Sequence, residues 1–288
     1  MSAAWGFGFV PATELSGAGR VLFEELCERA SDEAGIAFSP LVAQSYRDLI
    51  TALEERRIGL AWMPPVPMIE AMESKSVGTP LAIPARRGLT VYHSALIVRR
   101  GGPRTLAALE GRRAAWVERD SAAGYLVPRM HLAAQGHDVR RFFARELFVH
   151  SHAAVIDAIS SGQADVGATY CHVDVATKHV SRAPWLDDEG RSTRPVEPIA
   201  TMGPIPNDAL VASTELPATA RASITRWLLA LDPRAKDLFE RILGAHDFRI
   251  PSPDHFEALR HSLRAARARG HDAMPRDSRR GLRVGQRS

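Results

Sequence analysis

The sequence of 288 residues has little cysteine and no long apolar run. Its two cysteines, Cys27 and Cys171, lack the spacing of a metal-binding or redox motif, so we expect both to be buried packing thiols. No run of about eighteen apolar residues occurs, which excludes a conventional membrane-spanning helix. Residues 1–10 lack the cationic and apolar segments of a secretory signal and are predicted to form a strand. The chain as written is therefore expected in the cytoplasm, or in the periplasm if an export leader precedes it.

Positive charge is unevenly distributed along the chain, whose formal net charge is +4. The stretch from Arg260 to Ser288 holds nine arginines and two aspartates, so the preceding residues carry a net charge of −3. A basic tail of this kind is able to touch nucleic acid or an anionic membrane. Its lack of aromatic residues is also typical of disorder, which we predict for residues 270–288.

The N-terminal third predicts alternating strands and helices. Short apolar stretches separated by segments of helical periodicity give the order β-α-β-α-β, which indicates a parallel or mixed sheet with helices on both faces. The expected elements are strands at Phe7–Val10, Phe38–Val42 and Ile58–Met63, and helices at Gly17–Ala34 and Tyr46–Arg56.

A second α/β series is predicted in the middle of the chain, followed by C-terminal helices. Its strands are expected at Val91–Val98, Ala114–Val117, Glu146–Val149 and Val166–Thr169, and its helices at Tyr125–Ala134 and His152–Ser160. The C-terminal helices are expected at Ala218–Leu231, Ala235–Leu243 and Asp254–Arg267.

One predicted turn has the features of an anion site. An apolar strand at Ala114–Val117 leads through small residues, Ser121–Gly124, into a helix. With no bulky side chains there, several backbone N–H groups can face outward at the positive end of the helix dipole, a geometry that holds an oxyanion. Small residues are also common in α/β turns for packing alone, and Ser121 is a good helix N-cap. Both interpretations remain open from these residues.

Several motifs in a fixed order resemble one known family. They are Tyr46–Leu53, Ile58–Pro65, Ser151–Ile159, Asp165–Ala168 and Ile205–Val211. Together they are similar to the phosphate, phosphite and phosphonate-binding proteins of ABC transporters, and the resemblance spans Phe7 to Leu263. It implies an α/β type 2 periplasmic-binding fold, or Venus flytrap, with two lobes, mixed sheets and two crossover strands. Lobe I would comprise residues 1–92 and 204–269, and lobe II residues 93–203.

The resemblance also implies which residues bind the ligand. The family has Ser-Thr-Ser-Gly at the anion turn, whereas this chain has Ala122 and Ala123 in place of two hydroxyl donors. Unless other donors replace them, their loss is expected to weaken phosphonate binding by orders of magnitude, so a carboxylate, a less charged organic ligand and a weakly bound phosphonate are all candidates. Asp208 is expected to pair with a cationic group of the ligand. The predicted ligand-binding residues are Tyr46, Tyr92, Ser94, Ser121, Ala122, Ala123, Gly124, Tyr125, Ser151, His152 and Asp208.

We therefore predict binding of a small anionic solute, with hinge closure, by a component of an ABC transporter or by a sensor. The expected partners are the ligand and a permease or sensor protein, with no specific nucleic acid, and the chain is expected to be a monomer. No nucleophile elbow, P-loop, Rossmann fingerprint or zinc spacing is found, so no catalytic residue, metal or cofactor is predicted. The alternative is a cytosolic enzyme on the same fold, of the dehydratase or cofactor-precursor biosynthesis type.

Overall fold

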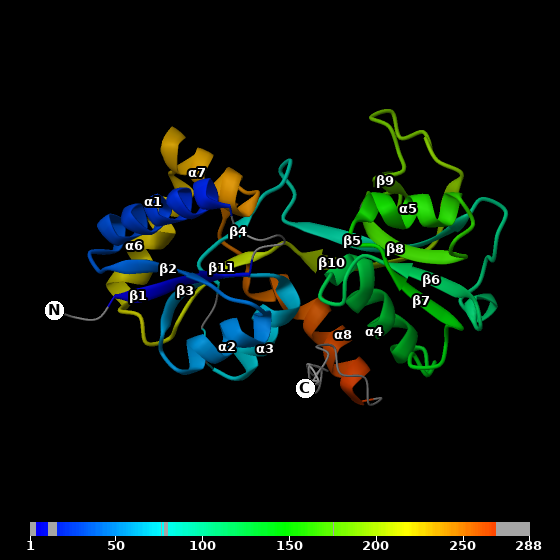
Figure 1. The fold of residues 1–288 in the computed structure, drawn as a ribbon, viewed down its shortest axis with the longest axis horizontal. Helices are drawn as coiled ribbons and strands as arrows, with labels where there is room; N and C mark the ends of the chain where they lie inside the picture. The colour runs from blue at the N-terminus through cyan, green and yellow to red at the C-terminus, as the bar shows by residue number, and fades with distance from the viewer. Residues whose placement is uncertain (1–3, 11–15, 76, 78–79, 175, 269–288) are drawn as a thin grey trace, which may run out of the picture. The chain divides into compact units, whose positions relative to one another are not determined.

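The chain forms two compact units in the computed structural model, which describes residues 4–10, 16–75, 77, 80–174 and 176–268 (Figure 1). The first unit comprises Met1–Tyr92 and Pro204–Arg260, and the second comprises His93–Gly203 and the described residues from 261 onward. Two boundaries fall inside long strands, β5 (Val91–Arg99) and β10 (Val196–Pro206), so these strands carry the chain from one unit to the other. The predicted tail, residues 270–288, lies outside the described residues.

The first unit is built on a four-stranded sheet in the order β11-β3-β1-β2. Strands β1, β2 and β3 are parallel, and β11 runs antiparallel to β3. Helices α1, α6 and α7 lie over one face, and α2 and α3 over the other (Figure 1). The elements are β1 (Trp5–Phe9), α1 (Gly17–Ala34), β2 (Phe38–Val42), α2 (Tyr46–Glu54), β3 (Ile58–Met63), α3 (Pro65–Glu73), β4 (Ile83–Pro84), β11 (Ala209–Ala212), α6 (Ala218–Leu229), α7 (Pro233–Leu243), β12 (Phe248–Arg249) and the 3-10 turn η3 (Pro253–Phe256).

The second unit is built on a sheet in the order β10-β5-β8-β6-β7, with β9 paired to β8. Strands β6, β7 and β8 are parallel, whereas β5 and β9 run antiparallel to β8. The parallel strands therefore end at the same edge of the sheet. Besides β5 and β10, the elements are η1 (Ala107–Leu109), β6 (Arg113–Trp116), η2 (Ala122–Leu126), α4 (Val127–Ala134), β7 (Arg145–Phe148), α5 (His152–Ser160), β8 (Val166–Val173) and β9 (Val180–Arg182); α8 (Glu257–Ala268) begins in the first unit and ends in the second.

Ordinary capping chemistry sets the ends of the helices. Ser16 accepts a hydrogen bond from the Gly19 N–H at the start of α1, and Gly35 ends that helix with a φ of 68°. Asp232 caps α7 and Gly244 ends it in the same left-handed conformation. Serine and aspartate accept the unsatisfied N–H groups of a first turn, and glycine takes a positive φ without strain. These local signals explain why the sequence patterns located the helices well.

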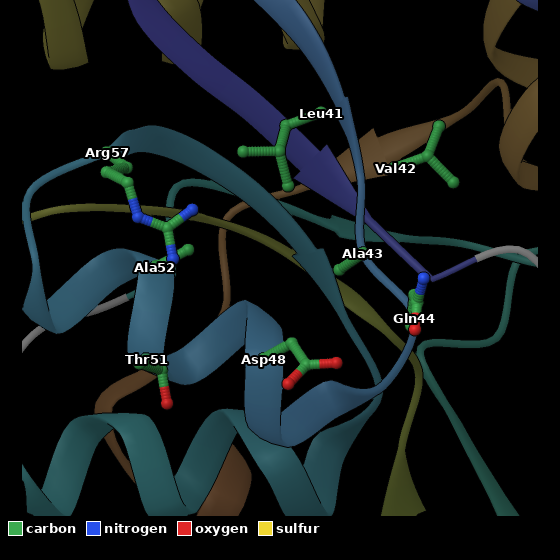
Figure 2. A pocket seen from close by; sticks show the side chains of 8 residues that line it. All are labelled: Leu41, Val42, Ala43, Gln44, Asp48, Thr51, Ala52 and Arg57. Atoms are coloured by element: carbon green, nitrogen blue, oxygen red, sulfur yellow. The ribbon is translucent and has the colours of Figure 1, made fainter.

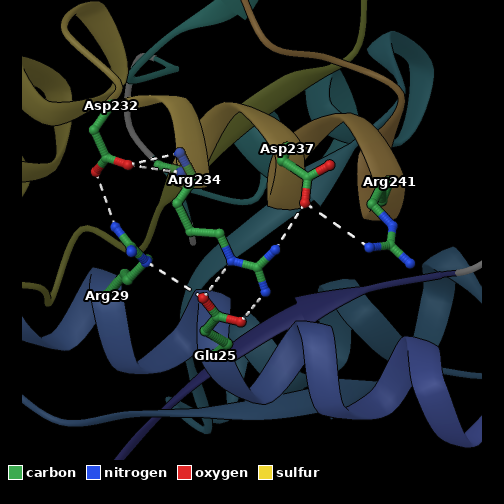
Figure 3. Close-up of polar contacts among 7 residues, drawn as sticks. Glu25, Arg29, Asp232, Arg234, Asp237 and Arg241 are labelled. Atoms are coloured by element: carbon green, nitrogen blue, oxygen red, sulfur yellow. Dashed lines mark hydrogen bonds and ion pairs between the residues drawn. The ribbon is translucent and has the colours of Figure 1, made fainter.

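An exposed ion-pair network joins α1 to α7 in the first unit (Figure 3). Arg234 pairs with Glu25 on α1 and with Asp237 on its own helix, and Arg29 pairs with Asp232 at 2.9 Å. Each of these side chains is about one third to one half exposed, so water screens the charges and the network contributes little per pair.

The predicted α/β fold with mixed sheets and two crossover strands is confirmed. Both cysteines are buried as expected, and burial raises the pKa of each thiol to about 12. The predicted helix at Tyr125–Ala134 differs from the structure, because residues 122–126 form one turn of π-helix and α4 begins at Val127. The predicted strand at Val166–Thr169 extends to Val173 because its last residues pair with β9. Within the described residues, no helix has the length and apolar character needed to cross a bilayer.

Candidate functional site

The turn that follows β6 folds back onto its own strand. Ser121 is the N-cap, and its Oγ accepts a hydrogen bond from the Gly124 N–H at 3.1 Å. The Gly124 carbonyl accepts from the Val117 N–H, and the Ser121 carbonyl accepts from the Leu126 N–H, a five-residue spacing. That spacing defines the π-helical turn η2, which continues directly into α4. Single π-helical turns within α-helices are frequent at functional sites.

Glycine is required at position 124 by close packing. A Cβ atom built there would lie 2.4 Å from Val117 Cγ2 and 2.7 Å from Ser121 Oγ, and contacts this short do not occur between real atoms. Packing therefore explains this small residue without a ligand. Ala122 and Ala123 are also buried, with 7% and 3% of their surfaces exposed.

Two backbone donors at this turn have no acceptor within the described part of the chain. The Gly124 N–H is taken by Ser121, but no partner is found there for the N–H groups of Ala122 and Ala123. Unpaired N–H groups in the first turn of a helix attract an anion, and the helix dipole adds to this attraction. Two backbone N–H groups of this turn are therefore free to donate to an anion, whereas the Gly124 N–H is already taken by Ser121.

Ser94 on β5 lies beneath this turn and holds it in place. Its side chain is fully buried, and its hydroxyl donates to the Ala123 carbonyl at 2.6 Å. Since a hydroxyl has one proton, that donor is occupied in this conformation. Ser94 thus contacts the turn itself.

The neighbouring strand brings His152 to the same edge of the sheet. Strand β7 is parallel to β6, and the Val149 and His150 N–H groups donate to the Trp116 and Val117 carbonyls, so the two turns lie side by side. Ser151 caps α5, with its Oγ accepting from the Ala154 N–H at 3.1 Å. His152 is the first residue of α5. The structure therefore brings the Ser121 turn and His152 together within the second unit.

The imidazole of His152 is held by two residues of β8. Its Nδ1 lies 2.9 Å from Thr169 Oγ1, and its ring meets the Tyr170 ring edge-on at 4.9 Å between centroids. Burial lowers the pKa of His152 to about 4, so the ring is neutral at neutral pH. A neutral imidazole still offers one N–H donor.

A buried polar cluster supports the other side of the turn. Tyr125 packs edge-on against Trp116 and Phe148, and the Arg129 guanidinium lies 5.0 Å from the centre of the Tyr125 ring. One oxygen of Glu146 accepts from both Trp116 Nε1 and Arg129 Nη1, each at 2.6 Å. Burial raises the pKa of the Tyr125 hydroxyl. This cluster fixes the Tyr125 ring beneath the turn.

The remaining predicted residues belong to the first unit. Tyr46 is the half-buried first residue of α2, after its N-cap Ser45. Asp208 forms an ion pair with Arg86 at 3.1 Å, so its negative charge already has a partner within the unit. Tyr92 lies near this pair at the start of β5, and burial, with Asp208, raises the pKa of its hydroxyl.

A separate pocket of about 450 Å³ opens beside β2 and α2 in the first unit (Figure 2). It contains none of the predicted ligand-binding residues. The Arg57 guanidinium that lines it donates to Glu55 at 2.8 Å, so this cationic side chain already has a carboxylate partner. The lining residues are Leu41, Val42, Ala43, Gln44, Asp48, Thr51, Ala52 and Arg57. As for metals, no group of three or more His, Cys, Asp or Glu side chains arranged to hold an ion is found among the residues that the structure describes.

Sequence reasoning missed Thr169 and the Arg129–Glu146 pair. Both act through contacts between residues far apart in the chain, so no local motif marks them. A threonine in the buried strand that follows a helix beginning with histidine is the signal that was present for Thr169.

The fold and the turn at the strand edge define a class, the substrate-binding proteins with a type 2 periplasmic-binding fold. Residues 7–256 match the family model described as ABC transporter, phosphonate, periplasmic substrate-binding protein, and the chain belongs to that family. The family resemblance predicted from the sequence is thereby confirmed.

Solved structures of low sequence identity share this fold. XAC2383 from Xanthomonas citri, solved with chloride, is 21% identical with a TM-score of 0.71, and the match covers 93% of this chain and 99% of that one. A binding protein component of an ABC phosphonate transporter from Pseudomonas aeruginosa is 19% identical with a TM-score of 0.62, covering 93% and 87%. PhnD1 from Prochlorococcus marinus, solved with methylphosphonate, is 17% identical with a TM-score of 0.59, covering 91% and 97%.

Proposed function

We propose that this chain binds a small anionic solute through the η2 turn and His152, as the solute-binding component of an ABC transporter or as a sensor. The observation that carries the proposal is that two sets of hydrogen-bond donors lie side by side at one edge of the second unit's sheet. The unpaired N–H groups of Ala122 and Ala123 lie in a turn side by side with the turn that begins α5 at His152. Phosphonate, phosphate-like and carboxylate groups are all oxyanions that such donors suit.

The character of the donors supports a weakly charged ligand or modest affinity. His152 is a neutral donor, and Ser121 carries the one serine or threonine hydroxyl in the turn. Hydrogen bonds to a charged group contribute about 1.5–3 kcal/mol each. Relatives of this chain have been solved with methylphosphonate, chloride or ATP, which are the probes to begin with.

The family description supports a permease as the partner and the periplasm as the location, and both form part of this proposal. We also propose that the chain acts as a monomer.

The test is a thermal-shift screen followed by calorimetry on single variants. Phosphate, phosphite, methylphosphonate, acetate and chloride are screened first, because a ligand that binds the native state raises its stability. Ser121→Ala and His152→Ala are each expected to weaken binding of the best probe by about 1–3 kcal/mol.

Two matched controls separate binding from folding. Ser16→Ala removes an N-cap of the same geometry from α1, and His131→Ala removes a partly buried imidazole from α4. Both controls are expected to keep wild-type affinity. Equal loss of affinity in the controls and the site variants would refute the assignment, as would the absence of binding for every probe.

A further inference from the structure

We infer that Thr169 is a positioning residue, whose hydroxyl holds His152 in the tautomer that carries its proton on Nε2. This inference deepens the proposed function, because it makes His152 an N–H donor for an anion. It rests on the hydrogen bond between Thr169 Oγ1 and His152 Nδ1.

The hydroxyl of Thr169 has one partner within the described part of the chain. Thr169 lies on β8 and is fully buried, and no acceptor other than His152 Nδ1 is found there for its proton. A buried hydroxyl whose proton has no acceptor is costly. The arrangement that avoids this cost has the hydroxyl donating and Nδ1 accepting.

Acceptance at Nδ1 fixes the other nitrogen of the ring. A neutral imidazole carries one proton, so a ring that accepts at Nδ1 carries its proton on Nε2. The opposite tautomer would donate from Nδ1 to Thr169 Oγ1 and leave the threonine proton without an acceptor. The neutrality of the ring agrees with its burial.

The surroundings of His152 leave Nε2 available and the ring immobile. No partner of Nε2 is found among the described residues, and the edge-on contact with Tyr170 restricts rotation of the ring. On the adjoining turn His150 Nδ1 lies 3.5 Å from Glu118, and on α5 the Asp157 carboxylate pairs with Arg194 at 3.2 Å, so neither contact involves His152. A neutral N–H donor of fixed direction is therefore available at the start of α5.

The first test reads the tautomer without any ligand. Nitrogen-15 and proton correlation spectra of the whole protein distinguish a protonated ring nitrogen from an unprotonated one. We expect His152 to show Nε2–H alone at neutral pH. A protein in which Nδ1 carries the proton would overturn the inference, whatever its affinity for anions.

The second test uses substitutions at Thr169 with methylphosphonate as the probe. Thr169→Val keeps the shape and removes the hydroxyl, whereas Thr169→Ser keeps the hydroxyl. Thr169→Val is expected to bring an Nδ1–H signal of His152 into the spectrum and to weaken binding by about tenfold. Thr169→Ser is expected to keep the wild-type spectrum and an affinity within about threefold of wild type.

The control is Thr193→Val, which removes a hydroxyl that donates to the Trp185 carbonyl elsewhere in the same unit. It is expected to change neither readout. Unchanged affinity and unchanged tautomer in Thr169→Val would overturn the inference. If that variant does not fold, the wild-type spectrum and Thr169→Ser still decide it. Failure of the wild type to bind methylphosphonate would count against this ligand and leave the tautomer measurement unaffected.

Discussion

The two units share an α/β layer plan, yet their candidate polar groups differ in charge. In the first unit Asp208 is paired with Arg86, and an exposed ion-pair network joins α1 to α7. In the second unit the hydrogen bonds that Ser94, Ser121 and Thr169 make in the η2 turn and to His152 are neutral, and the Arg129–Glu146 ion pair supports the turn only through the Tyr125 ring. The proposed anion site therefore depends on the oriented N–H groups and the helix dipole of the second unit, whereas the paired charges of the first unit largely cancel.

The largest difference in the free energy of unfolding is expected between substitution of a buried arginine and substitution of an exposed one. Arg129→Met removes the cationic partner of Glu146 at a guanidinium site that is only 8% exposed. Breaking a fully buried pair costs about 3–5 kcal/mol, and because the Glu146 side chain is 26% exposed we expect a loss near the lower end of that range. Arg234→Met acts on a side chain that is 42% exposed, where the cost is about 1 kcal/mol or less. Chemical denaturation of both variants measures this. Similar losses from the two would mean that the Arg129 cluster does not support the turn as described.

The next largest effect is a dependence of the unfolding free energy on pH that comes from His152. Its pKa is about 4 in the folded protein and 6.5 without burial. Between these values the unfolded chain binds the proton more tightly, so the free energy of unfolding rises with pH through this window and gains nothing above it. The full contribution is roughly 3 kcal/mol.

His152→Gln is therefore expected to flatten the rise of unfolding free energy between about pH 4 and 6.5, where the folded and unfolded pKa values of His152 differ. Other histidines whose pKa burial lowers, such as His93 and His255, remain in both proteins, so the difference between them isolates His152. His179→Gln, at an exposed imidazole, is the control. Parallel curves for His152→Gln and wild type would show that the ring is hydrated in the folded state.

A smaller effect on stability is expected from replacing a glycine with alanine in each of the two units. Gly124→Ala places a Cβ against Val117 and Ser121, and overpacking of this kind costs about 1–3 kcal/mol. Gly17→Ala is the matched change in the first unit, at the start of α1 with nothing within 4 Å of the added atom. It is expected to be neutral or slightly stabilising. Thermal unfolding measures both, and a tolerated Gly124→Ala would contradict the close packing of the turn.

The sequence predicted the parts of the candidate site that depend on local signals. Ser121 and Ser151 are N-caps where small and polar residues precede apolar helices, and His152 follows its cap directly. The π-helical turn could not be predicted, because the five-residue hydrogen bond from the Leu126 N–H to the Ser121 carbonyl has no sequence signature and the turn also contacts the end of its own strand through the Val117 N–H and the Gly124 carbonyl. Thr169 and Glu146 meet their partners only through strand pairing across the sheet. Spacing along the chain carries no information on such contacts.

The smallest effects give the sharpest comparison of charged and neutral contacts. Arg86→Gln removes a partly exposed ion pair and is expected to cost at most about 1 kcal/mol at low salt. Ser94→Ala leaves the Ala123 carbonyl buried without its donor and is expected to cost about 1–2 kcal/mol. Added salt screens the first contact and not the second, so raising NaCl to about 1 M should abolish the Arg86→Gln difference from wild type and leave the Ser94→Ala difference unchanged. Chemical denaturation at both salt concentrations checks this, with each variant compared with wild type at the same salt. If the Ser94→Ala difference also disappeared in salt, the turn would be held by charge, and the contrast between the neutral hydrogen bonds of the η2 turn and the ion pairs of the first unit would be wrong.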